Sequence, residues 1–208
     1  MADRPTRILV PVARPDEAEP LLRLATALLG GQAGRVIALG VVEVPDSPAY
    51  SQAAARAREL RRRLQAVCAE IPDAGRVEVR SAVRVSRRAW QGIRRVALQE
   101  QVDLVVLGWA GEVFGTTLAA VVREPPADLA IVRGTLPGRP LRRLLLAVRG
   151  GPQAELAFRW AAALAEALNL QVTVLNVRPR GQSLQERARA EHVFAGVARL
   201  AERRPRFS

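Results

Sequence analysis

A strand, a glycine turn and the start of a helix follow one another near the middle of the chain. The apolar run 104–107 ends in Gly108-Trp109-Ala110-Gly111, and a helical pattern begins at Gly115-Thr116-Thr117. Amides at the start of a helix have no partner within it and carry the positive end of the helix dipole, while glycine lets the backbone approach an anion. The pattern therefore predicts an anion site at Gly108, Gly111, Gly115, Thr116 and Thr117, with a tight turn that holds no ligand as the alternative.

Short apolar runs alternate with helical patterns on both sides of this stretch. The runs cover residues 7–12, 36–44, 76–85, 104–107 and Asp128–Val132. Strands separated by helices pair in parallel through right-handed crossovers, so the chain predicts an α/β fold with a doubly wound, parallel, five-stranded sheet of order 3-2-1-4-5. Ser86 is expected to cap the third helix. Strands one and four are neighbours in this order, so the loop with Ala13 and Arg14 should face the glycine turn.

The pattern begins again after a linker at residues 136–140. Residues 143–148 match residues 7–12, and a constant offset of 136 residues, the difference between 143 and 7, carries Ala18-Glu19 onto Ala154-Glu155. Duplication predicts a complete domain at 1–135 and an incomplete second βαβα unit at 141–208, with its last helix at 184–203. Because this unit has no third, fourth or fifth strand, the strand at 143–148 would have one edge unpaired, and we expect the unit to lean on the first domain or on another copy of the chain.

The basic residues are all arginines. There are 32 of them against 20 acidic residues, which gives a net charge of +12. Such a charge attracts polyanions without specificity, but the arginine clusters lack the interleaved aromatic residues of a single-strand binder. We therefore interpret them as solvated faces and expect no specific nucleic-acid partner; a contiguous arginine face would favour the alternative. The clusters are Arg61-Arg62-Arg63, Arg87-Arg88, Arg142-Arg143 and Arg203-Arg204.

The cysteine content, the lengths of the apolar stretches and the few candidate catalytic residues indicate the cellular compartment and whether the chain is an enzyme. Cys68 is the one cysteine and lies on the apolar side of a helical pattern, which predicts a buried thiol in a reducing compartment. No apolar stretch is long enough to span a bilayer and no signal-peptide pattern occurs, so we expect no membrane insertion and a cytoplasmic location. His192 has no nucleophile near it in sequence, Asp103 lies at a strand end, and no metal-ligand spacing occurs. The chain is therefore not predicted to be an enzyme.

Several of these motifs together resemble the universal stress protein family. They are L-V-V-L-G-W-A-G followed by F-G-T-T, D-L-A-I-V after a double proline, and the internal repeat. The resemblance covers the first domain and the first half of a second, as in tandem domains that occur alone or as cytoplasmic tails of permeases and antiporters. It implies a flavodoxin-like sheet, a homodimer through the fifth-strand edge Asp128–Val132, and a membrane transporter as partner.

The same resemblance bears on the ligand, because the family divides into adenine-nucleotide binders and non-binders. The phosphate-binding motif of the binders matches Gly108, Gly111, Gly115 and Thr116, which implies ATP or another adenine nucleotide. The spacer Glu112-Val113-Phe114 is shorter than in the binders, and Ala13-Arg14-Pro15 replaces an acidic residue after strand one. Two hypotheses follow. One is a module that binds a nucleotide or a smaller anion, in which Arg14 either supplies charge-assisted hydrogen bonds or is an ordinary solvated arginine. The other is an interaction module without nucleotide.

Overall fold

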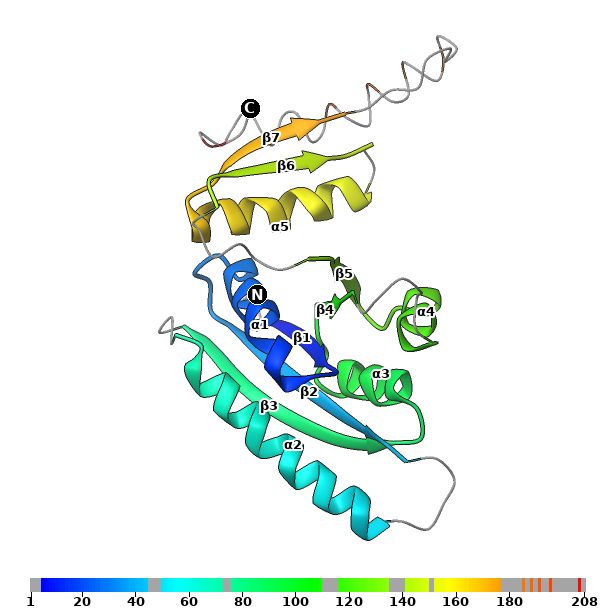
Figure 1. Cartoon of the computed structure of the whole chain (residues 1–208). Coiled ribbons are helices and arrows are strands. Elements are labelled where there is room, and N and C mark those ends of the chain that lie inside the picture. Colours follow the sequence, from blue (N-terminus) through cyan, green and yellow to red (C-terminus); the bar gives the residue numbers. More distant parts are fainter. Residues whose placement is uncertain are drawn as a thin grey trace. The chain divides into compact units, whose positions relative to one another are not determined.

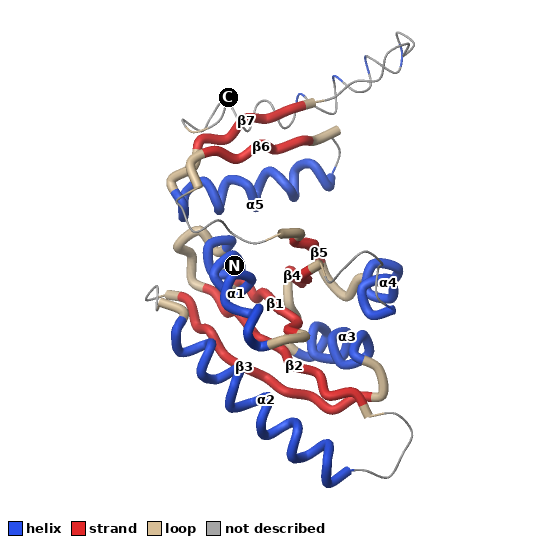
Figure 2. Tube along the Cα trace, in the orientation of Figure 1, coloured by secondary structure: helices blue, strands red, loops and turns tan. Residues whose placement is uncertain are grey.

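A computed structural model describes residues 5–44, 50–72, 76–109, 116–134, 141–149 and 152–176, and the single residues 185, 188, 191, 195 and 206. The chain divides into two compact units, Met1–Leu136 and Pro137–Ser208, which are described separately. Figure 1 labels the elements along the chain, and Figure 2 shows its helices, strands and loops. The first unit contains β1 (Thr6–Val12), η1 (Pro15–Glu17), α1 (Ala18–Leu28), β2 (Gly34–Glu43), α2 (Tyr50–Glu70), β3 (Val77–Ser86), α3 (Ala89–Gln99), β4 (Leu104–Gly108), α4 (Thr116–Arg123) and β5 (Asp128–Val132).

The first unit is built on one parallel sheet. Its strands follow the order β3-β2-β1-β4-β5, which confirms the predicted doubly wound, flavodoxin-like arrangement. Figure 1 shows α1 and α2 on one face and α3 and α4 on the other. The inner strands β1 and β4 are buried on both faces because helices cover both, which explains why their sequences are apolar almost throughout.

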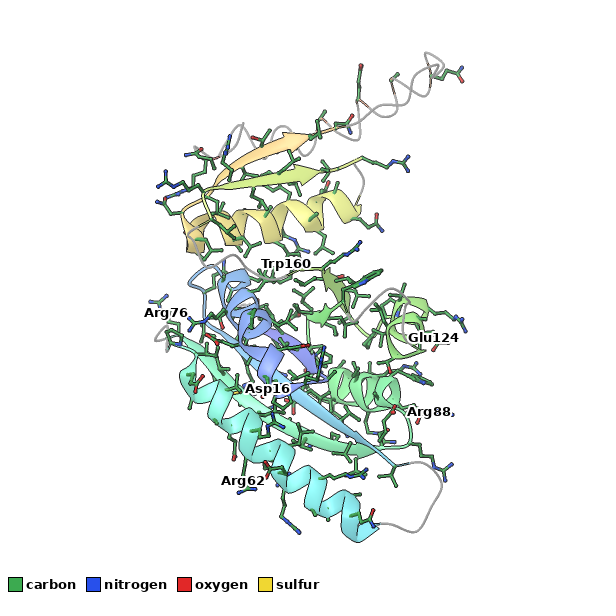
Figure 3. All side chains as sticks on the ribbon, in the orientation of Figure 1. Asp16, Arg62, Arg76, Arg88, Glu124 and Trp160 are labelled. Carbon is green, nitrogen blue, oxygen red and sulfur yellow. The ribbon has the colours of Figure 1, made fainter. Side chains whose placement is uncertain are left out.

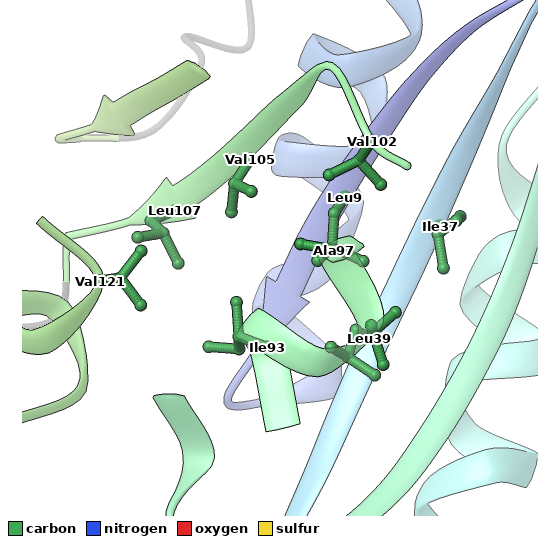
Figure 4. Close-up of a cluster of buried hydrophobic side chains, with 10 residues drawn as sticks. Leu9, Ile37, Leu39, Ile93, Ala97, Val102, Val105, Leu107 and Val121 are labelled. Carbon is green, nitrogen blue, oxygen red and sulfur yellow. The ribbon is translucent and has the colours of Figure 1, made fainter. Parts of the chain in front are cut away.

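A cluster of aliphatic side chains fills the space between the sheet and α3. Leu9, Ile37 and Leu39 project from β1 and β2 and are 0% exposed, and they pack against Ile93 and other apolar residues of α3. Figure 4 shows this cluster. Burying each such side chain contributes about 1.5–3 kcal/mol relative to leaving it in water. The cluster therefore fixes α3 against the middle of β1 and β2.

The start of α3 corrects one prediction, because Ser86 does not cap this helix. Ser86 is the last residue of β3 and lies opposite Glu43 of β2 in the ladder, and α3 begins only at Ala89. Arg88 stands at the N-cap position without a side-chain cap. Instead, the Ala89 amide donates a hydrogen bond to Oε1 of Glu43. Because β3 continues as far as Ser86, a carboxylate from the neighbouring strand satisfies the helix terminus in its place.

The second unit repeats the beginning of the first. It contains β6 (Arg143–Ala147), α5 (Pro152–Leu168) and β7 (Gln171–Leu175), with β6 and β7 paired in parallel. Leu145 lies opposite Thr173, as Leu9 lies opposite Ile37 in the first unit, so the offset of the duplication is kept in the register. Within the described residues β6 pairs with β7 alone, which is the unpaired edge that the sequence predicts. The predicted helix 184–203 lies outside the described residues, apart from isolated positions.

One face of the second sheet is covered and the other is not. Phe158 and Ala162 of α5 pack under Val148, and Ala165 packs under Val172. On the opposite face Leu145 is 60% exposed and Leu175 is 40% exposed. The duplication makes them equivalent to Leu9 and Leu39, which α3 covers in the first unit. Among the described residues of the second unit, no helix takes the place of α3 over these leucines.

The positions of the arginine clusters agree with the interpretation that they are solvated faces. All described members of the clusters are exposed and lie on separate elements: three on α2, two before α3 and two at the start of β6. Arg62 pairs with Glu59, and Arg63 pairs with Asp16. Figure 3 shows Arg62 and Arg88 on different sides of the first unit. Arg203 and Arg204 lie outside the described residues.

Candidate functional site

A pocket lies where the carboxyl ends of the central strands meet the first residues of α3 and α4. Its volume is about 330 Å³, at the lower end of the range for small-molecule sites. In an open α/β sheet this is the edge at which ligands bind, beside the point where the strand order reverses between β1 and β4. The lining residues are Pro11, Val12, Ala13, Leu39, Val41, Glu43, Ala89, Ile93, Leu107, Gly108, Thr117 and Leu118.

Three of the residues singled out from sequence line this pocket together. Ala13 follows β1, Gly108 ends β4 and Thr117 lies in the first turn of α4, so the fold brings together residues far apart in the chain. Thr116 is the first residue of α4. Gly111 and Gly115 lie outside the described residues. The assignment of these residues to a ligand therefore stays a prediction.

Arg14 has a different environment from the one that would bind an anion directly. Its guanidinium Nη2 lies 2.6 Å from Oε1 of Glu17, and 71% of the side chain is exposed. Arg14 is not among the residues that line the pocket. An exposed ion pair three residues apart contributes little to stability. Breaking the contact between Arg14 and Glu17 would therefore cost little free energy.

The first residues of the glycine turn are attached to the end of β5. The Trp109 amide donates a hydrogen bond of 2.7 Å to the carbonyl of Val132. The guanidinium carbon of Arg133 lies 5.6 Å from the centre of the Trp109 ring, a distance at which cation–π attraction operates. These contacts fix the chain as it leaves Gly108 and place a cationic side chain beside the turn.

Among the described lining residues, Glu43 is the charged one, and it was not among the residues singled out from sequence. It is the acidic residue at the carboxyl end of β2, a strand that is otherwise almost entirely apolar. An acid that closes such a strand at the ligand-binding edge of a sheet is a usable sequence signal. Its contact with Ala89 could not be foreseen, since it depends on where β3 ends and α3 begins.

The pocket is mainly apolar in its walls. Leu39, Val41, Ile93, Leu107 and Leu118 line it, and among the lining residues that the structure describes Glu43 is the one that carries a charge. The first turn of α4 carries no acidic residue, so the positive end of that helix is not neutralised within the helix. The pocket thus has apolar walls, a carboxylate beside α3 and the start of a helix at α4.

Two other sequence candidates have structural roles. The Asp103 carboxylate accepts a hydrogen bond of 2.8 Å from the Arg7 amide, and the Asp103 amide donates to the Arg7 carbonyl. Asp103 thereby ties the start of β4 to β1, as expected for a residue at a strand end. Cys68 is buried, as predicted, and burial raises the pKa of its thiol above the ordinary value of 9.0. His192 lies outside the described residues.

The described residues contain neither a membrane-spanning helix nor a cluster of metal ligands. No helix there is both long and apolar enough to cross a membrane. In the same part of the chain, no group of three or more His, Cys, Asp or Glu side chains is arranged to hold a metal ion.

The fold and the place of the pocket define a doubly wound α/β protein of the flavodoxin-like class with a site at the switch point of its sheet. The sequence model of the universal stress protein family matches residues 5–133 and again residues 140–204. These two stretches cover most of the chain, so the chain belongs to the universal stress protein family. The second match agrees with the tandem arrangement inferred from the repeat.

Known proteins give the same result for the fold. A universal stress protein from Archaeoglobus fulgidus DSM 4304 matches with a TM-score of 0.60 and 14% identity, over 94% of this chain and 76% of that one. The hypothetical protein PH0823 matches with a TM-score of 0.50 and 23% identity, over 63% of this chain and 98% of that one. The Na(+)/H(+) antiporter NhaS5 of Synechocystis is 25% identical over 190 residues, which are 86% of this chain. The match spans only 27% of the antiporter.

Proposed function

We propose that the pocket binds a small anionic ligand, an adenine nucleotide or a smaller anion, and that the protein is a regulatory module rather than an enzyme. The observation that carries this proposal is the convergence of Ala13, Gly108 and Thr117 on one pocket at the switch point. The ligand's anionic group would lie against the first turn of α4, where amides without helical partners and the helix dipole favour negative charge. Membership of the universal stress protein family supports the same role.

The test places a negative charge where the anion would lie. Thr117→Glu adds a carboxylate to the first turn of α4 at the pocket, a position where an acidic residue favours the helix itself. Gln91→Glu is the matched control, because Gln91 is exposed in the first turn of α3 and does not line the pocket. Calorimetric titration with ATP, ADP and inorganic pyrophosphate at moderate salt compares the three proteins.

We expect saturable binding to the wild type and to Gln91→Glu, and binding weaker by about tenfold or more in Thr117→Glu, which corresponds to about 1.4 kcal/mol. Circular dichroism and thermal melting show whether both variants are folded. Binding to none of the three probes, or equal binding by Thr117→Glu and the wild type, would count against the proposal.

We also propose that the molecule forms a homodimer through β5. Asp128–Val132 is an edge strand whose one partner among the described residues is β4. Ile131 on this strand is 40% exposed. An open edge with an exposed aliphatic side chain is a ready template for pairing with another copy.

A second candidate function is an interaction module that holds no nucleotide and regulates a membrane transporter. The similarity to part of the Na(+)/H(+) antiporter NhaS5 favours it. Measured occupancy separates the two candidates: the second predicts that the protein is purified without nucleotide and takes up none in the titration. A nucleotide found in stoichiometric amount, together with a gene neighbourhood that lacks any transporter, would argue against it.

A further inference from the structure

Glu43 lines the pocket, and its carboxylate can accept more hydrogen bonds than the one it accepts in the structure. It ends β2, on the side of the sheet that α3 covers, and it lines the pocket together with Ala89 and Ile93. Its Oε1 accepts the amide hydrogen of Ala89, the first residue of α3. An ionised carboxylate accepts hydrogen bonds at both oxygens, about four in all, and donates none. One helix amide therefore leaves most of its accepting capacity for another partner.

The surroundings of this carboxylate determine which chemical groups can bind favourably beside it. Glu43 itself is exposed, and the neighbouring walls are the aliphatic side chains of Leu39, Val41 and Ile93, which offer no hydrogen bonds to a bound molecule. A phosphate or carboxylate placed there would meet a like charge, which is unfavourable. A neutral group with N–H or O–H hydrogens would donate to the carboxylate, and hydrogen bonds to a charged acceptor are the stronger ones.

We propose that Glu43 is a specificity-determining residue that accepts hydrogen bonds from a hydroxyl or amino group of the ligand, as a nucleoside would supply. This inference rests on the proposed function and adds an orientation to it. The anionic end of the ligand points to α4, the neutral donor end to Glu43, and an apolar ring system lies between the aliphatic walls. The site accordingly selects a nucleoside phosphate over inorganic phosphates.

The test uses a variant that keeps the helix contact. In Glu43→Gln the amide oxygen still accepts the Ala89 hydrogen, while the charge and one accepting oxygen are lost. Glu78→Gln is the matched control: it removes the same charge from an exposed residue of β3 that pairs with Arg35 at 2.7 Å, away from the pocket. Calorimetric titration of the full chain with ADP, adenosine and inorganic pyrophosphate compares these two variants with the wild type, and thermal melting confirms that each is folded.

We expect ADP and adenosine to bind Glu43→Gln about ten- to a hundredfold more weakly than the wild type. Pyrophosphate binding should be unchanged or stronger, and Glu78→Gln should resemble the wild type with all three probes. Equal weakening of ADP and pyrophosphate, or ADP binding that Glu43→Gln leaves unchanged, would overturn the inference while the proposed function stands. A wild type that binds none of the probes would overturn both.

Discussion

The internal duplication offers a matched pair of leucines for measuring what a covering helix contributes. Leu9 of β1 is 0% exposed beneath α3, whereas its repeat equivalent Leu145 of β6 is 60% exposed. Truncating leucine to alanine removes three carbon atoms, worth about 2.4 kcal/mol of transfer free energy when fully buried. The cavity left at Leu9 raises the expected loss to about 3–4 kcal/mol. At Leu145, where about two-fifths of the side chain is buried and the gap opens to water, the expected loss is about 1 kcal/mol.

Urea unfolding followed by tryptophan fluorescence measures both losses, because each unit has its own reporter. Trp90 and Trp109 belong to the first unit and Trp160 to the second, so Leu9→Ala is measured in a Trp160→Phe background. Leu145→Ala is measured in a background with Trp90→Phe and Trp109→Phe. A loss above about 2 kcal/mol for Leu145→Ala would refute the reasoning, since a side chain so exposed cannot lose that much transfer free energy. It would mean that another surface covers this face in solution.

Two further predictions concern the sheet edge and the buried thiol. Ile131→Lys should shift the dimer to monomer in sedimentation velocity, because a charge on an edge strand opposes pairing. Val122→Lys, at a comparably exposed position on α4, should stay dimeric. Equal effects of the two substitutions would contradict pairing at β5. Burial raises the pKa of Cys68, so the stability that its neutral form contributes is present below pH 9.0 and is lost as the pH rises through the higher folded value. The free energy of unfolding of the wild type should therefore fall towards that of Cys68→Ala above pH 9.0, and a constant difference between the two proteins up to pH 11 would exclude this linkage.

The strand order could be predicted from sequence because alternating apolar runs and helical patterns allow few topologies. The bounds of β5 were predictable because Pro125 and Pro126 end the preceding helix and Asp128–Val132 is a short apolar run. The placement of Ala13 near Gly108 followed from the strand order alone. Local pattern and topology together were sufficient for these features.

The details of the site depended on contacts that no local pattern contains. The N-terminus of α3 was assigned to Ser86 from residue type, but the ladder between β2 and β3 extends to the pair of Glu43 and Ser86 and delays the helix to Ala89. The role of Glu43 follows from that register. For Arg14 the sequence left two roles open, a hydrogen-bond donor to the anion or an ordinary solvated arginine, and in the structure it pairs with Glu17, three residues further along the chain. Side-chain pairing of this kind depends on rotamers and exposure, which the sequence does not encode position by position.

The contact between Trp109 and Arg133 makes Trp109 an intrinsic fluorescent reporter of the pocket. The indole ring follows Gly108 directly and lies beneath a guanidinium from the end of β5. A ligand that attracts this cation, or moves the turn, changes the polarity around the ring and with it the emission of Trp109. With Trp90 and Trp160 replaced by phenylalanine, the fluorescence of Trp109 alone would report occupancy of the pocket, without any attached dye.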